Sequence, residues 1–267
     1  MPESHYENFP VASLLLPSRL REPVSAIYAF ARSADDFADE GQLSPERRLA
    51  LLAGYRQQLD ALERGDPGGQ PVFSRLRPVV AEYGLPLSLF HDLLDAFSQD
   101  VVKTRYGSFA ELMDYCRRSA NPVGRLLLRL FAADSPEHRI WSDAICSALQ
   151  LINHWQDVAI DWRKDRIYLP AEDMARFNVS EQDVAQQNCD ERWQALLQFE
   201  LDRASDLMTM GAPLGRALPG RVGIEMRAII SGGLRIVDKI RAAGYDVFHH
   251  RPTLGPFDWI RVVAAAL

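Results

Sequence analysis

The chain has 267 residues, of which 47% are hydrophobic and 25% are charged, as is usual for a soluble globular protein. Its formal net charge of -6 argues against binding to a nucleic-acid backbone, which needs a basic surface, but permits a local basic pocket. No apolar run reaches the roughly 18 residues of a membrane span, and we expect no signal peptide because the N-terminus lacks a basic region followed by an apolar one.

Turn-forming residues cut the chain into helical segments. Helical periodicity dominates, and the alternation typical of strands is scarce. The clearest breakers are Gly65 to Gly69, Gly84 to Pro86, Tyr106 to Ser108, Asp134 to Pro136 and Gly211 to Gly220. We interpret Gly65 to Gln70 as a loop, because too few helices precede it to form a core of their own. The sequence therefore predicts a single all-α domain over residues 1–267.

A first stripe of polar residues lies near the N-terminus. Tyr28, Arg32, Asp35 and Asp39 have offsets of zero, four, seven and eleven, which bring them onto one face of a helix. The two aspartates are one turn apart, where like charges repel, and a hard divalent cation would offset that repulsion. The alternative is a solvated acidic face. The apolar residues around Tyr28 predict a helix buried on several sides, so we favour a metal site.

The next segment of interest runs from Tyr115 to Gly124. Small residues follow Tyr115, and the pair Asn121-Pro122 predicts a break in the helix that leaves room for a bulky ligand. The alternative is an ordinary corner between two helices.

A second polar stripe contains Gln150, Asn153, Asp157 and Asp161, with offsets of zero, three, seven and eleven on one predicted helix. If the two stripes face each other, they supply four carboxylates and one amide oxygen for a cluster of Mg²⁺ ions. Since Mg²⁺ recruits phosphate oxygens as further ligands, the implied substrate is a diphosphate, and the metals would neutralise a leaving pyrophosphate.

Basic residues follow the second stripe. Lys164 and Arg166 are candidates to bind phosphate oxygens, or alternatively complement the dipole at the end of a helix. The six histidines show no metal-binding spacing, and the segment from His249 to Arg251 beside Pro252 is expected to be an exposed turn. Three widely spaced cysteines, without a CxxC pair, are expected to be reduced thiols of a cytoplasmic protein.

At three segments the sequence resembles the squalene/phytoene synthase family: Phe9 to Glu40, Ser108 to Gly124 and Gln150 to Pro170. The resemblance spans nearly the whole chain. It implies a single-domain isoprenoid synthase fold, with helices around a central cavity and Mg²⁺ as the metal. By motif position, it implies metal ligands at Asp35, Asp39, Asn153, Asp157 and Asp161, substrate-binding residues at Tyr28, Arg32, Gln150, Arg166 and Tyr168, and an active-site tyrosine at Tyr115.

Departures from the family pattern indicate similarity to one subgroup of the family. The segment Gln156 to Asp161 begins with glutamine where the family has arginine, and Asn121-Pro122 stands where the family has glycine and a variable residue. Together with His5 to Ser13 and Asn153 to Asp157, these residues are similar to the bacterial hydroxysqualene synthase subgroup. That subgroup acts in hopanoid-linked squalene biosynthesis and converts presqualene diphosphate to hydroxysqualene.

The resemblance implies that water captures the cation, so we expect no NADPH. Asn121 can donate and accept hydrogen bonds and is our candidate to hold that water, unless it is only a cap or turn residue before Pro122. One alternative function is head-to-head synthesis of presqualene diphosphate, squalene or phytoene. Another is a non-catalytic assembly or lipid-binding protein. We expect a cytoplasmic location and leave open a peripheral contact with the inner membrane and with neighbouring enzymes of the squalene pathway.

Overall fold

The computed structural model describes residues 16–39, 43–66 and 69–267, so the His5 to Ser13 segment and Glu40 lie outside the described residues. Over these ranges the regular structure is α-helical, apart from one isolated bridge between Arg105 and Ile167, which confirms the all-α prediction. The helices are α1 (Ser18–Asp39), α2 (Pro45–Glu63), α3 (Pro71–Tyr83), α4 (Leu87–Val102), α5 (Phe109–Ser119), α6 (Asn121–Leu130), α7 (Pro136–Gln156), α8 (Val158–Arg163), α9 (Ala171–Arg176), α10 (Glu181–Ala185), α11 (Glu191–Gly211), α12 (Leu214–Ala217), α13 (Gly220–Ala242) and α14 (Pro256–Ala266).

Helix α1 buries one face and leaves another for the site. Apolar residues recur every three or four positions along its length and pack against α3 and α4. Phe30 lies at the centre of this contact and meets Phe73 and Phe90 edge-on, with ring centroids 5.7 and 5.1 Å away. Asp35 and Asp39 are only half-buried. Their polar stripe therefore lies off the buried face of the helix.

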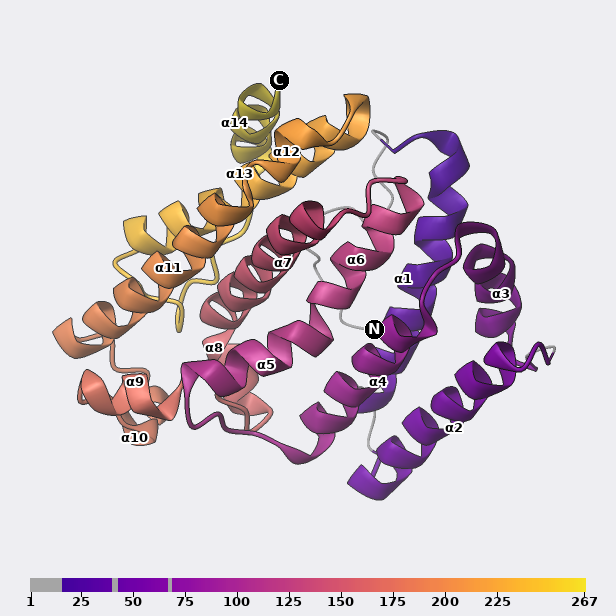
Figure 1. Cartoon of the computed structure of the whole chain (residues 1–267). Helices are drawn as coiled ribbons and strands as arrows, with labels where there is room; N and C mark the ends of the chain where they lie inside the picture. Colours follow the sequence, from indigo (N-terminus) through magenta and orange to yellow (C-terminus); the bar gives the residue numbers. More distant parts are fainter. Residues whose placement is uncertain (1–15, 40–42, 67–68) are drawn as a thin grey trace.

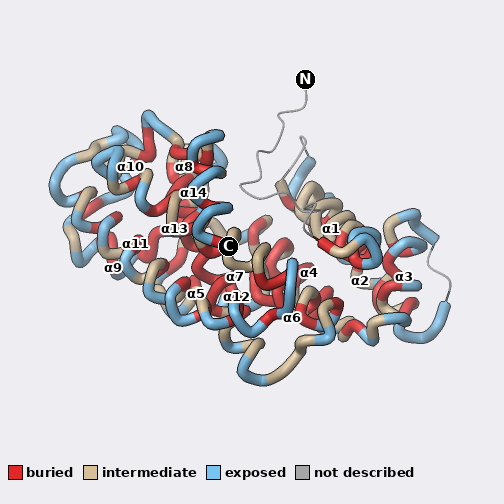
Figure 2. The backbone as a smooth tube through the Cα atoms, turned by 90° about the horizontal axis from the view of Figure 1, so that it is seen from above, coloured by how far each residue is buried: buried red, intermediate tan, exposed pale blue. Residues whose placement is uncertain are grey.

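Two hydrophobic clusters build the core. The first joins α1 to α4 with part of α6, and the second joins α5, α7, α11 and α13 with the segments around them. Phe131 packs against both clusters and links them. Figure 1 shows α1 to α4 on one side of the molecule, α11, α13 and α14 on the other, and α5 to α7 between them. Buried residues gather where the helices face each other in Figure 2.

The break between α5 and α6 falls at Ala120, and Pro122 lies in the first turn of α6, which confirms the break predicted there. The next helical turn comes very close to α7. A Cβ atom at Gly124 would clash with the side chains of Ser142 and Cys146, so glycine is required at this contact. The corner therefore fixes α5 and α6 against the helix that carries the second polar stripe.

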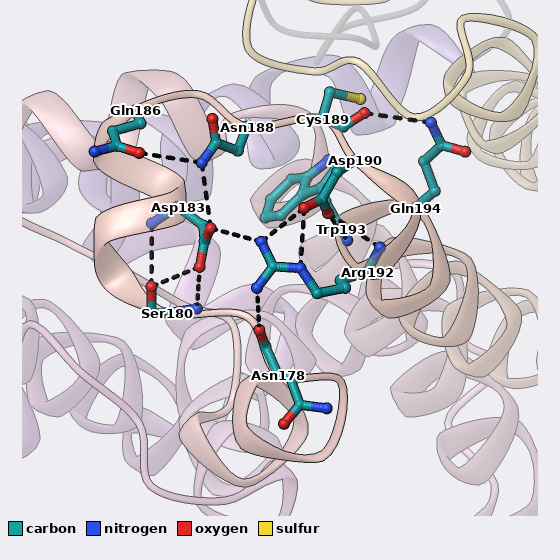
Figure 3. A network of polar contacts seen from close by, with 10 residues as sticks. All are labelled: Asn178, Ser180, Asp183, Gln186, Asn188, Cys189, Asp190, Arg192, Trp193 and Gln194. Carbon is teal, nitrogen blue, oxygen red and sulfur yellow. Dashed lines mark hydrogen bonds and ion pairs between the residues drawn. The ribbon is translucent and has the colours of Figure 1, made fainter.

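A network of polar contacts holds the beginning of α11, the helix that packs along α7 (Figure 3). Asp190 caps α11 by accepting from the backbone N–H groups of Arg192 and Trp193. The Arg192 guanidinium also donates to Asp183 on α10 and to the backbone oxygen of Asn178. These contacts tie α10 to the beginning of α11.

The second polar stripe differs from its prediction in one respect. Its spacing predicts an unbroken helix, but α7 ends at Gln156, and Asp157 has φ -106° and ψ 13° before α8 begins. The loop before α14 contacts the chain at this point, since Gln156 donates to the Pro252 oxygen and Arg251 donates to Asp157. Within the described ranges, none of the helices is both long and apolar enough to cross a membrane.

Candidate active site

One cavity of about 190 Å³ collects residues from both polar stripes. It is smaller than most pockets for drug-sized ligands, which suits the diphosphate end of a substrate. The stripes on α1 and on α7–α8, far apart in sequence, therefore meet at one polar site. The described residues that line it are Asp35, Asp39, Asp100, Tyr115, Gln150, Asn153, His154, Asp157, Asp161, Arg166 and Tyr168.

The first aspartate pair is held by three cationic side chains. Arg32, one turn earlier on α1, donates to Asp35 at 3.3 Å. Asp39 accepts from Lys164 Nζ at 3.0 Å and from Arg166 Nη1 at 2.6 Å. Burial raises the pKa of Asp35 to about 6, and the neighbouring charge of Asp39 adds to the rise. Burial also raises the pKa of Asp39, but Arg166 and Lys164 outweigh it and hold this pKa below its usual value.

The second pair is only half neutralised. The Arg251 guanidinium pairs with Asp157 through Nε and through Nη2, the latter at 3.1 Å. No side chain in the described part of the chain hydrogen-bonds to the Asp161 carboxylate. Burial raises the pKa of Asp161 to about 8, and repulsion by Asp157 and Asp39 contributes to the rise. Asp161 is thus a half-buried acid whose pKa stays raised although the charges of Arg166 and Lys164 act against the rise, and it binds no cation directly among the described residues.

This donor set fits a divalent metal, although no three His, Cys, Asp or Glu residues among those described already converge on a metal position. Asp35, Asp39 and Asp157 each bind an arginine or lysine in this structure. Asp161 carries the raised pKa expected of a ligand without its cation. Carboxylate oxygens, with the Asn153 amide beside them, are ligands that hard cations prefer.

Of the twelve site residues predicted from the sequence, nine line the cavity and three are absent from its described lining. Arg32 is close by, because it pairs with Asp35 and, at 2.7 Å, with Asp36. Tyr28 lies one turn before Arg32 on the same helix. Asn121 is buried, and its Oδ1 accepts from the Ser147 hydroxyl of α7 at 2.9 Å.

Three residues at the site were not predicted. Asp100 and His154 line the cavity, and Arg251 pairs with Asp157. His154 stacks on Tyr168 with ring centroids 3.6 Å apart, and its burial lowers its pKa to about 3, so the imidazole is neutral. The expected exposed turn before Pro252 is wrong for Arg251. That residue is only 28% exposed because its side chain turns inward to Asp157, whereas His249 and His250 are exposed.

Asp100 did leave a signal in the sequence. It follows Leu93 and Phe97 at helical spacing on the buried face of α4, so an acid stands where the pattern requires an apolar residue. Arg251 left no comparable signal, because its partner lies 94 residues earlier in the chain.

An all-helical fold with four carboxylates and several basic side chains at one cavity fits the class of α-helical enzymes that bind a diphosphate through divalent metal ions. Comparison with known families is consistent with this class: the squalene/phytoene synthase family matches residues 3–258. The chain therefore belongs to the squalene/phytoene synthase family, as the sequence motifs predicted.

Individual relatives agree on the family and differ in product. The chain is 35% identical to the hydroxysqualene synthase of Rhodopseudomonas palustris, over 95% of this chain and 85% of that protein. It is 32% identical to the 15-cis-phytoene synthase of Synechococcus elongatus, over 92% and 83% of the two chains. The crystal structure of the squalene synthase HpnC from Alicyclobacillus acidocaldarius matches with a TM-score of 0.84 and 36% identity, over 91% of each chain. The prediction of an enzyme of this family is confirmed.

Proposed function

We propose that this enzyme ionises presqualene diphosphate in the presence of Mg²⁺ and lets water capture the resulting cation, giving hydroxysqualene and diphosphate. The observation that carries the proposal is the meeting of Asp35, Asp39, Asp157 and Asp161 at one polar cavity. The departures at Asn121 and Gln156 favour this reaction over the others of the family, as does the 35% identity to a hydroxysqualene synthase.

Mg²⁺ would be held by Asp35 and Asp39 on one side of the cavity and by Asn153, Asp157 and Asp161 on the other. When bound, it supplies the positive charge that favours departure of the diphosphate. Three basic side chains at the carboxylates, those of Arg32, Lys164 and Arg166, are within reach of a diphosphate in the same cavity. Gln150 and Tyr168, which also line the cavity, add polar contacts for the substrate.

The aromatic wall of the cavity has a separate role in the proposal. Tyr115 on α5, His154 on α7 and Tyr168 in the segment after α8 pack against one another. Aromatic faces stabilise a cation through their negative π-systems, and a packed wall keeps bulk water away from it. Since the neutral His154 is not a competing positive charge, this wall is suited to a carbocation.

The second candidate is head-to-head synthesis from two prenyl diphosphates. It is favoured by the 32% identity to a phytoene synthase, whose coverage is close to that of the hydroxysqualene synthase. Both reactions begin with ionisation of a diphosphate, so the same aspartates would serve either one. The family assignment leaves the non-catalytic reading without support.

Product analysis separates the two candidates. Purified protein with Mg²⁺ receives either presqualene diphosphate or prenyl diphosphates alone, and the lipid products are identified by mass spectrometry. We expect hydroxysqualene from presqualene diphosphate, with label entering the alcohol in ¹⁸O-labelled water and no diversion to squalene on addition of NADPH. Squalene as the main product with NADPH, or consumption of prenyl diphosphates alone, would contradict the proposal while leaving the family unchanged.

A further inference from the structure

A buried acid on α4 lies at the wall of the cavity and is not one of the expected metal ligands. Among the described residues, no cation pairs with its side chain. Asp100 lies in the last turn of α4 and is 7% exposed. Its Oδ2 accepts from the Tyr115 hydroxyl at 2.7 Å, and its Oδ1 accepts from the Tyr168 hydroxyl at 3.2 Å. Arg166 donates to the backbone oxygen of Asp100, not to the carboxylate. One carboxylate therefore holds two phenols that line the same cavity.

The direction of these hydrogen bonds follows from the chemistry of the groups. An ionised carboxylate can only accept, so each phenol donates its single proton to Asp100. The hydroxyl oxygens of Tyr115 and Tyr168 then have no proton left to donate elsewhere and can only accept from a molecule in the cavity. A charged acceptor also strengthens the partial negative charge on both oxygens.

Packing fixes the two rings in this arrangement. The Tyr168 ring stacks between Tyr106, at 5.5 Å between centroids, and His154, at 3.6 Å. The Tyr115 ring lies 5.6 Å from Tyr106 and 5.8 Å from Tyr168. Since rings packed in this way cannot swing freely, their hydroxyl oxygens stay at the wall of the cavity.

Capture of a carbocation by water places two requirements on the site. The water must direct a lone pair at the carbon, so its hydrogens must be accepted by the protein. It must also lose a proton, because the new C–O bond leaves a positively charged oxygen. Tyrosine oxygens that can only accept, backed by a carboxylate, meet both requirements.

We propose that Asp100 is the positioning residue and final proton acceptor for the capturing water, acting through the hydroxyl of Tyr115, with Tyr168 holding the second contact. This inference rests on the proposed water capture. The C–O bond to diphosphate breaks and the diphosphate leaves with that electron pair. The cation rearranges, and the water oxygen forms its bond to the electron-deficient carbon of the rearranged cation. The water gives one proton to Tyr115 Oη, which passes its own proton to Asp100. The tyrosine is unchanged, and Asp100 becomes neutral until it releases the proton to solvent.

The surroundings of Asp100 favour gain and loss of a proton near neutral pH. Burial raises its pKa to about 7, and the hydrogen bonds from the two phenols and the charge of Arg166 act against this rise. Tyr115 is the better relay of the two tyrosines because its hydrogen bond to Asp100 is the shorter. Asn121 remains the alternative holder of the water, and its Oδ1 is bound to Ser147.

The test separates ionisation from capture. Presqualene diphosphate carrying ¹⁸O in the bridging oxygen is incubated with Mg²⁺ and the wild-type enzyme, Asp100→Asn or Tyr115→Phe. Migration of the label to a non-bridging position reports ionisation followed by return of the diphosphate, and mass spectrometry reports the alcohol. We expect the alcohol to fall by at least about tenfold in both variants while label migration continues, since proton transfer by a placed group contributes roughly 10²–10⁴-fold.

Controls keep the outcomes distinct. Glu200→Gln removes another buried acid, on α11 and absent from the described cavity lining, and should leave both readouts unchanged. Tyr168→Phe should lower the alcohol less than Tyr115→Phe. If alcohol and label migration fall together in Asp100→Asn and in Tyr115→Phe, or if neither changes, the proton-acceptor role is wrong. If Asp100→Asn does not fold, Tyr115→Phe alone decides. Absence of alcohol from the wild-type enzyme contradicts the proposed function itself, before any variant is considered.

Discussion

The two acidic groups of the cavity are built differently. Asp35 and Asp39 lie on one continuous helix, and Asp39 is its last residue. Asp157 lies at the break between α7 and α8, and Asp161 lies within α8. The first group is therefore set by the helix itself, whereas the position of the second also depends on the loop that contacts α7 at its end.

Their charge balance differs as well. Among the described residues, three cations pair with the first two acids: Arg32 binds Asp35, and Lys164 and Arg166 bind Asp39. In the same part of the chain one cation, Arg251, pairs with the second two acids, and the pKa of Asp161 is raised to about 8. The second group thus holds more uncompensated acid in the absence of metal, and we expect it to gain more from an added cation.

The largest effect on activity is expected from removing a single carboxylate from either acidic group of the cavity. Asp35→Asn and Asp157→Asn should each lower diphosphate release by at least about 100-fold, because a lost metal ligand forfeits several kcal/mol of transition-state stabilisation. The fold should remain, since amide and carboxylate have nearly the same shape. Steady-state diphosphate release at limiting Mg²⁺ measures the effect, with circular dichroism as the control. Full activity in either variant would contradict the metal assignment.

A shared site for metal and diphosphate predicts a joint effect on stability. Mg²⁺ and pyrophosphate together should raise the melting temperature by more than the sum of their separate shifts. A ligand at about 100 times its Kd stabilises the folded state by about 2.7 kcal/mol, and each ligand here completes the binding site of the other. Thermal melts with each ligand and with both measure the shifts. Purely additive shifts would indicate separate sites.

The unequal charge balance can be tested at Arg251. Arg251→Gln should lower the stability of the metal-free protein by about 2 kcal/mol, between the values typical of surface and buried ion pairs, because Asp157 keeps its charge and loses its partner. Added Mg²⁺ should restore more stability in this variant than in the wild type. Urea unfolding with and without Mg²⁺ measures both effects. Arg241→Gln, which breaks a more exposed pair with Asp202, is the matched control. If Mg²⁺ stabilises Arg251→Gln and Arg241→Gln equally, the proposed difference in charge balance is wrong.

The sequence predicts those features of the site that depend on residues close together in the chain. It does not predict those that depend on contacts between distant residues. The acids are found because helical spacing is local: offsets of seven and eleven place them on one face wherever the helix lies. The continuity of the second helix was predicted wrongly, because the break coincides with contacts from residues 251 and 252. Pairing of Asp39 with Lys164 joins residues 125 positions apart, and no local pattern records such a contact. The all-α fold was predictable for the same local reason as the acids.

A buried acid outside the described lining of the cavity provides a structural reference for the acids of the site. Glu200 on α11 is fully buried, and both of its side-chain oxygens lack a hydrogen-bond partner among the described residues. Burial raises its pKa from the usual 4.5 to about 8, the neighbouring charge of Asp173 adds to the rise, and Arg203 acts against it.

Glu200 should also change how stability depends on pH. Between pH 4.5 and about 8 the folded state retains the Glu200 proton that the unfolded chain releases, so this residue lowers stability as pH rises. Its contribution is at most about 1.4 kcal/mol per pH unit. Glu200→Gln removes it, so the variant should gain stability relative to wild type from pH 5.5 to pH 7.5. Asp35, Asp100 and Asp161 contribute slopes of the same sign, but these are common to both proteins and cancel in the difference. Urea unfolding at the two pH values measures that difference, and identical slopes would mean that Glu200 titrates as an exposed acid does.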